Sequence, residues 1–171
     1  MRQTTARLPW LLIGMIGGIG NSMILGNFDS TFAAHPEMAL YIPLIGGTGG
    51  NVRTQSSAII VQGLANSSLD AKNTFKQITK ESVVALINAT IISLLVYTYN
   101  FIRFGATATV TYSVSISLFA VVMFASIFGT LVPMTLEKFK IDPAIATGPF
   151  IAITNDIIGM MLYMGITVLL S

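Results

Sequence analysis

Five long apolar stretches constrain the fold of this chain more than any other feature. A helix needs about 20 mostly apolar residues to cross the roughly 30 Å hydrocarbon core of a bilayer, and each stretch reaches that length. Of the 171 residues, 53% are hydrophobic and only 9% are charged, whereas an average soluble domain carries about 25% charged residues. We therefore predict an all-α integral membrane protein with five transmembrane helices in one domain, residues 1–171. The predicted spans are Leu8–Phe28, Met38–Ala65, Ser82–Ile102, Thr109–Pro133 and Pro143–Leu170.

The basic residues outside the spans predict the orientation of the chain. Seven of them fall on one side of the alternating connections and only Arg103 falls on the other, while Arg53 lies inside the second span. Because short cytoplasmic loops are enriched in Lys and Arg, the N-terminus is expected in the cytoplasm and the C-terminus outside. This arrangement is that of a multi-pass protein of the cell inner membrane. The seven basic residues are Arg2, Arg7, Lys72, Lys76, Lys80, Lys138 and Lys140.

The composition disfavours catalysis and nucleic-acid binding. The chain has no cysteine, and its only histidine, His35, lies in a polar connection. The sequence therefore offers no residue for thiolate chemistry and only one histidine for Ser–His chemistry or for a His-rich metal site. The formal charge of +2 is too small to indicate nucleic acid as a partner. We expect a protein that is not an enzyme.

One carboxylate, Asp156, interrupts the last apolar stretch. Counted along a helix, it lies roughly 16 Å from Ile145 and 21 Å from Leu170, close to the middle of the bilayer. A central Asp costs about 2.5 to 3.5 kcal/mol on insertion, so an acid there is a functional hypothesis by default. Gly148 and Ala152 share its helix face and Asn155 is adjacent. The alternative is a buried acid that bonds a neighbouring helix, because small residues at this spacing also favour close helix contact.

The second span contains a cluster of glycines followed by polar residues. Pro43 and four glycines fall between positions 43 and 50, and each helical glycine costs about 1 kcal/mol relative to alanine. We therefore expect a broken helix whose carbonyls line a wet cavity. A glycine-mediated packing contact is an equally good interpretation of this stretch taken alone. The polar residues that follow are Asn51, Thr54, Gln55, Ser56 and Ser57.

The oxygen-only side chains of the spans favour a hard cation. Mg²⁺ loses its water reluctantly and is usually held by one or two carboxylates with several waters retained. One Asp156 per chain cannot surround an ion, but two copies around a two-fold axis would supply two carboxylates. We therefore expect a homodimer that binds Mg²⁺ as its transported ion at the shared axis, with lipid around it.

The chain also resembles the membrane domain of the MgtE magnesium channels and their eukaryotic solute-carrier relatives. The resemblance implies a homodimer in which the second and fifth helices of both subunits line one central pore. It implies that Asp156 holds a hydrated Mg²⁺, that backbone oxygens of Ala152 and Gly148 lie on the same wall, and that Asn51 is a polar pore position. The segments that carry it are RLPWLL at 7–12, IPLIGGTGGNVRTQSSAIIVQGLA at 42–65, LINA at 86–89 and IDPAIATGPFIAITNDIIGMMLY at 141–163.

Three departures from the family pattern leave alternatives open. Channel-type members usually carry cytoplasmic magnesium-sensing domains before the first span, and none is expected here because seven residues precede Leu8. Arg53 stands where the pattern usually has glycine; it would alter transport, pair with an acid or turn outward. Gly148 stands where some members have Asn. Beside a Mg²⁺ channel or transporter, a Na⁺- or H⁺-coupled divalent-cation exchanger and a non-conducting membrane interaction module remain as alternatives.

Overall fold

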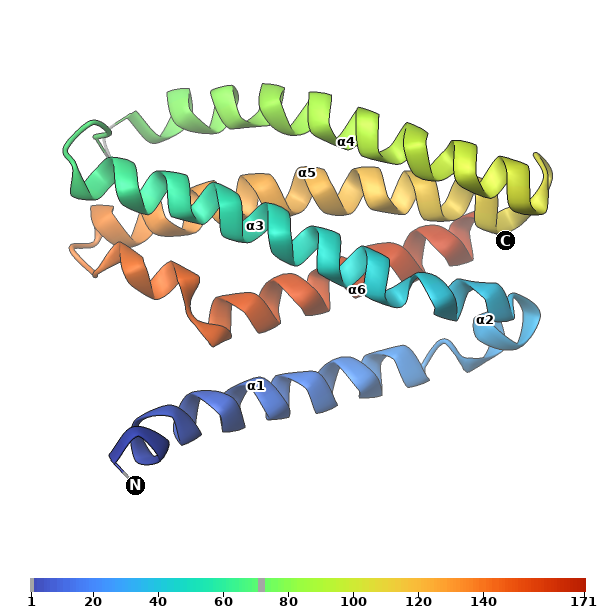
Figure 1. The fold of residues 1–171 in the computed structure, drawn as a ribbon, viewed down its shortest axis with the longest axis horizontal. Helices are drawn as coiled ribbons and strands as arrows, with labels where there is room; N and C mark the ends of the chain where they lie inside the picture. The colour runs from blue at the N-terminus through green and yellow to red at the C-terminus, as the bar shows by residue number, and fades with distance from the viewer. Residues whose placement is uncertain (1, 71–72) are drawn as a thin grey trace.

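The chain forms a bundle of long helices that run alternately along one axis (Figure 1). The computed structural model describes residues 2–70 and 73–171. The N- and C-termini lie at opposite ends of the bundle (Figure 1). The long helices are α1 (Arg2–Gly26), α3 (Ile42–Ala65), α4 (Thr74–Phe104), α5 (Thr109–Lys138) and α6 (Pro149–Leu170). The short helices are α2 (Asp29–Ala34) and the 3-10 helices η1 (Pro36–Tyr41) and η3 (Pro143–Thr147).

Helix α5 is the centre of the bundle. It packs against α3, α4 and α6, whereas α1 packs mainly on α6 and lies apart from α4 and α5 (Figure 1). The buried side of α5 includes aliphatic residues together with serine and threonine, for example Ser113, Ser117 and Thr130. The Ser57 hydroxyl of α3 donates to the carbonyl of Gly129 on α5 at 2.9 Å. Such polar contacts and close backbone packing are what associate helices when lipid replaces water.

The outside of the bundle is apolar. Long aliphatic side chains on α4 are exposed, including Leu95 and Ile102, and most of α1 is exposed as well, including Met23. A surface of this kind suits contact with lipid rather than with water. The molecule is thus a helical membrane protein, with hydroxyls inside and aliphatic side chains outside.

Four helices within residues 2–70 and 73–171 are both long enough and apolar enough to cross a membrane: α1, α4, α5 and α6. Helix α3 has 24 residues, which corresponds to about 36 Å and exceeds the hydrocarbon thickness. It is not among the four candidate spans, and its apolar run is interrupted by Arg53 and several polar residues. The helical membrane fold is therefore confirmed, while the count of five spans stays a prediction.

The expectation of a break in the second span was wrong. Helix α3 is continuous through its glycines, and the interruption occurs in the last predicted span instead. There η3 ends at Thr147, Gly148 is extended with φ −74° and ψ 166°, and α6 begins at Pro149. At Gly46 and Gly49 a neighbouring helix occupies the space that a side chain would need, whereas Gly47 and Gly50 have nothing within 4 Å. A Cβ atom on Gly49 would lie 2.8 Å from Val121 Cγ1 of α5.

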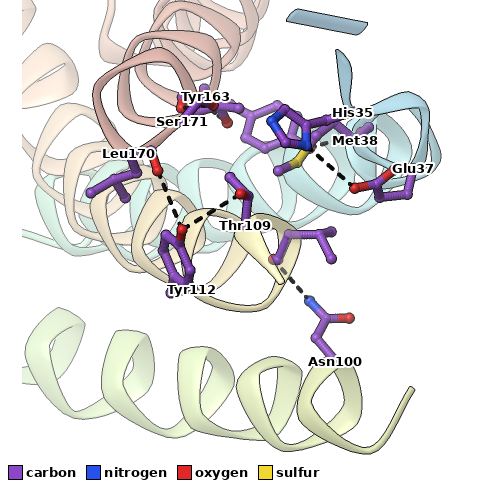
Figure 2. A network of polar contacts seen from close by, with 11 residues as sticks. His35, Glu37, Met38, Asn100, Thr109, Tyr112, Tyr163, Leu170 and Ser171 are labelled. Carbon is purple, nitrogen blue, oxygen red and sulfur yellow. Dashed lines mark hydrogen bonds and ion pairs between the residues drawn. The ribbon is translucent and has the colours of Figure 1, made fainter. Parts of the chain in front are cut away.

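Polar contacts fix the end of the bundle where α3 begins (Figure 2). The Tyr163 hydroxyl of α6 donates to the Met38 carbonyl of η1 at 2.7 Å. The Tyr41 hydroxyl donates to Asn100 Oδ1 of α4, and the Tyr112 hydroxyl of α5 donates to the Leu170 carbonyl of α6 at 3.3 Å. These bonds join η1, α4, α5 and α6, and so they set how α3 starts relative to α6.

Candidate functional site

Asp156 lies on α6 where this helix crosses α3. It is about 10 Å from the first residue of α6 and about 21 Å from the last, so it stays away from either end of the apolar segment. Its side chain is half-buried in the single chain. A carboxylate at this depth requires water, a cation or hydrogen-bond donors around it.

Asn155 precedes Asp156 directly on α6. It is 2% exposed, whereas Asp156 is half-buried. The carbonyl oxygen Oδ1 of Asn155 is buried and has no hydrogen-bond partner among the described residues. A buried acceptor without a donor costs about 1–3 kcal/mol. Carboxylate and amide oxygens are ligands of hard cations, so this pair is a candidate half-site for one.

The glycines of α3 allow the close crossing at this point. A Cβ atom on Gly49 would lie 3.8 Å from Asn155 Nδ2, in addition to its clash with Val121. A Cβ atom on Gly46, one turn earlier, would lie 3.2 Å from Met160 Cε of α6. The packing interpretation of these glycines is therefore the one that the structure supports.

Gly148 and Ala152 precede the acid at intervals of four residues. Ala152 is half-buried and lies one turn from Asp156 on α6. The sequence predicted that Gly148 lies inside the last helix. The structure instead places it directly before the first residue of α6. Its carbonyl accepts a hydrogen bond from the Ala152 N–H at 3.2 Å. The second lone pair of the Gly148 carbonyl oxygen can still accept another hydrogen bond.

Asn51 does not meet Asp156 within one chain. It lies two residues from Gly49, about 200° around α3, and its side chain is exposed. Gly47, Thr54 and Gln55 are exposed on the same side of α3. Of the five polar residues that follow the glycines, Asn51, Thr54 and Gln55 thus form an exposed polar stripe that faces out of the single chain. Ser56 and Ser57 are instead buried against α5.

Arg53 turns into the bundle instead of toward lipid. It is 6% exposed, and its guanidinium Nη2 donates to Thr54 Oγ1 at 3.2 Å. Of the alternatives left open by the sequence, the outward-turned side chain is wrong.

Glu81 is a polar residue whose position the sequence did not predict. It directly precedes the third predicted span, which starts at Ser82, but α4 begins at Thr74, so Glu81 lies about two turns inside this helix. Ser56 of α3 donates to its Oε1 at 2.7 Å, and Ser126 of α5 donates to the same oxygen. The two hydroxyl oxygens are 3.2 Å apart. Glu81 of α4 thus connects this helix with α3 and α5. The sequence would have indicated this role only if the early start of α4 had been recognised.

A single chain does not supply a complete metal site of the usual protein kind. In the part of the chain that the structure describes, no three His, Cys, Asp or Glu side chains come together. A hollow of about 970 Å³ lies elsewhere, beside the α3–α4 connection, with Leu69, Asp70 and Lys138 in its lining. It is open to solvent at the end of the bundle and is distant in sequence from Asp156, so we assign it no part in the site.

Comparison with known proteins agrees with this architecture. The model of the MgtE family, described as a divalent cation transporter, matches residues 42–166. The chain is 32% identical over 160 residues to the magnesium transporter MgtE of Bacillus subtilis, covering 94% of this chain and 35% of that protein. It is 32% identical over 165 residues to the magnesium transporter MgtE of Thermus thermophilus, covering 96% and 36%. The Enterococcus faecalis magnesium transporter MgtE is 28% identical over 169 residues, with 97% and 36% covered. The chain thus spans about a third of the length of these relatives.

Proposed function

This chain belongs to the MgtE family of divalent cation transporters, and we propose that it carries Mg²⁺ across the cell inner membrane. Its curated relatives are named magnesium transporters. The described residues agree with transport rather than catalysis, because the side chains at the candidate site offer oxygen ligands and no nucleophile paired with a base.

The observation that carries the proposal is the pair of Asp156 and Asn155 on one turn of α6. A carboxylate lies at membrane depth beside a buried amide oxygen that no donor among the described residues satisfies. Mg²⁺ takes oxygen ligands and keeps part of its water shell, so a few protein oxygens are enough to hold it. Backbone oxygens of Ala152 and Gly148 lie on the same side and would face the ion's water shell.

A second copy of the chain completes the proposed site. One chain supplies a single carboxylate, and a two-fold axis beside α3 and α6 would bring two Asp156 side chains to one ion. The exposed polar stripe of α3, which includes Asn51 and Gln55, supports a water-filled axis there, since polar side chains in lipid are costly. In this arrangement α3 is the fifth span, the N-terminus is cytoplasmic and the C-terminus is outside.

Flux measurements on purified protein test the proposal. Proteoliposomes with Mg²⁺ as the sole divalent cation should show uptake that falls by at least about tenfold in Asp156→Asn, because a loss of roughly 1.4 kcal/mol in ion stabilisation has that effect. Asp70→Asn removes an exposed carboxylate on the α3–α4 connection and should leave uptake unchanged.

Two results would contradict the proposal. Unchanged uptake by Asp156→Asn would remove this residue from the ion path. The absence of uptake by the unmodified protein would favour the non-conducting interaction module. Each variant must elute from a sizing column as the unmodified protein does, so that loss of folding is distinguished from loss of transport.

Coupled exchange is a second candidate, and Glu81 is the observation that favours it. This second half-buried acid is bonded by hydroxyls from α3 and α5, and carboxylates within membrane bundles mark proton and ion relays. Exchange predicts that Mg²⁺ flux depends on an opposing Na⁺ or H⁺ gradient and that Glu81→Gln abolishes this dependence. Flux that ignores both gradients would leave Glu81 with a structural role.

A further inference from the structure

Four lysines gather at one end of the bundle, where α4 begins and α5 ends (Figure 1). Lys76 and Lys80 lie one turn apart on α4, and Lys138 and Lys140 lie at the last residue of α5 and two residues beyond it. All four are exposed, and within residues 2–70 and 73–171 none of them forms an ion pair with an acid. Because like charges at this spacing repel each other, an anion bound between these lysines would stabilise this end of the bundle.

Two adjoining hollows lie beside the four lysines. The larger one, of about 970 Å³, is lined by the two lysines at the end of α5 together with Phe75 of α4. The smaller one, of about 420 Å³, is lined by the two lysines of α4 together with Met134 of α5. Leu69 and Asp70 belong to both linings, so the hollows share a wall. Asp70 and Glu137 are the acids in these linings, so four lysines face two carboxylates and the balance of charge is positive.

The shared wall is apolar and firmly packed. A Cβ atom on Gly63 of α3 would lie only 2.4 Å from Leu69 Cδ1, which shows how closely the Leu69 side chain lies on this helix. The Gly63 carbonyl accepts hydrogen bonds from the backbone N–H groups of Ser68 and Leu69, both at 3.0 Å. Leu69 therefore presents a fixed aliphatic surface beside the charged lysines.

Two exposed phenylalanines accompany the lysines. Phe75 directly precedes Lys76 and is 84% exposed, and Phe139 lies between Lys138 and Lys140 and is 71% exposed. Lysines combined with exposed phenylalanine and leucine are typical of protein surfaces that lie at the boundary between lipid headgroups and acyl chains. This end of the bundle has the side chains that such a boundary requires.

We propose that the two hollows bind the headgroups of anionic phospholipids, with the phosphate beside the lysines and the upper part of an acyl chain against Leu69 and Phe75. Charge complementarity argues for this occupant, because lysine clusters next to membrane-spanning helices attract anionic lipids. A zwitterionic headgroup also carries a cation, which the lysines repel. A free anion would neutralise the lysines but would leave the apolar wall and the phenylalanine rings uncovered. The inference goes beyond the proposed function and does not depend on which ion the protein carries.

Stabilisation by added lipid tests the inference on the purified full chain in detergent. The unfolding temperature is measured during titration with phosphatidylglycerol, with phosphatidylcholine of the same acyl chains, and with inorganic phosphate. A ligand that binds the folded form raises this temperature. We expect phosphatidylglycerol to raise it, and phosphatidylcholine and inorganic phosphate at the same concentration to leave it unchanged.

Removing one lysine from each hollow gives the matched comparison. In Lys76→Gln/Lys138→Gln the phosphatidylglycerol concentration that gives half of the maximal shift should rise at least about tenfold. Lys76→Arg/Lys138→Arg keeps both charges and should bind as the unmodified protein does. Arg7→Gln/Arg103→Gln removes two exposed charges outside the hollows and should also leave the binding of phosphatidylglycerol unchanged.

A second set of variants keeps the test decisive. Lys80→Gln/Lys140→Gln removes the other lysine of each hollow and repeats the test if the first double variant does not fold. Phe75→Ala removes part of the apolar surface and should weaken the binding of phosphatidylglycerol, whereas Leu169→Ala, where the replaced side chain is also 84% exposed, should not.

Four results would overturn the inference: equal shifts with the two lipids, an equal shift with inorganic phosphate, unchanged binding in the Lys→Gln double variants, or unchanged binding in Phe75→Ala. None of these results bears on Mg²⁺ flux, which the Asp156→Asn comparison tests separately.

Discussion

The contact between α3 and α5 at Gly129 allows a sharp prediction about stability. In Gly129→Ala the new methyl group would lie 2.6 Å from the Arg53 carbonyl oxygen and 3.0 Å from Ser56 Cβ. Both are far inside ordinary contact distance, and the nearer atom belongs to the backbone of a packed helix, so it cannot rotate away. Helix α5 must therefore move from α3, and the hydrogen bond from Ser57 to the Gly129 carbonyl must lengthen.

The magnitude follows from three contributions. Overpacking costs about 1–3 kcal/mol, and the weakened hydrogen bond costs about 1 kcal/mol. The higher helix propensity of alanine returns about 1 kcal/mol. The net loss of about 1–3 kcal/mol corresponds to a fall of about 2–12 °C in the unfolding temperature for a chain of this size.

Thermal unfolding in detergent, followed by the fraction of protein that still elutes as the native species, measures this change. Gly165→Ala is the control, because nothing lies within 4 Å of a Cβ atom at that position on α6. The control should unfold at the same or a slightly higher temperature. If Gly129→Ala is as stable as Gly165→Ala, then the close approach of α3 and α5 is not as described.

Three further predictions concern the contacts between helices and between copies. Glu81→Ala removes the acceptor of two serine hydroxyls and should lose about 1–3 kcal/mol of stability, with Glu81→Gln losing less; equal stability would contradict the three-helix tie. Tyr163→Phe loses the bond to η1 and should lower the unfolding temperature by the equivalent of about 1 kcal/mol, whereas Tyr97→Phe, an exposed tyrosine, should not. The chain has no cysteine, so an oxidant should cross-link two copies only where a cysteine is introduced beside the dimer axis. We expect cross-linking in membranes that contain Ala152→Cys and none in membranes that contain Leu169→Cys, where the replaced side chain is 84% exposed. The reverse result would place the dimer axis elsewhere.

The long helices could be predicted from the sequence because the length of an apolar run is fixed by bilayer thickness. Their ends were predicted less well. Helix α4 extends eight residues before the expected start at Ser82, since charged residues can continue a helix beyond its apolar run. The break at Gly148 was also missed, although proline follows it directly, and proline at the first position of a helix is a start signal.

The candidate site was predicted as a set of residues but not as an arrangement. Asp156 and its neighbour Asn155 were selected from the sequence because a carboxylate in an apolar run has few structural explanations. The direction of Arg53 could not be predicted, because a long side chain in a helix reaches either lipid or protein depending on packing. Asn51 lies on the far side of α3 from α6 in one chain, so its relation to Asp156 depends on a second copy that no single sequence describes.

The number of divalent ions bound per chain tests the central claim most directly. Mn²⁺ is a paramagnetic divalent cation that takes oxygen ligands as Mg²⁺ does, and its binding to the purified protein can be titrated by electron paramagnetic resonance. The proposed shared site predicts one tightly bound Mn²⁺ for every two chains, displaced by Mg²⁺ and lost in Asp156→Asn. One ion per chain, or undiminished binding by Asp156→Asn, would contradict it.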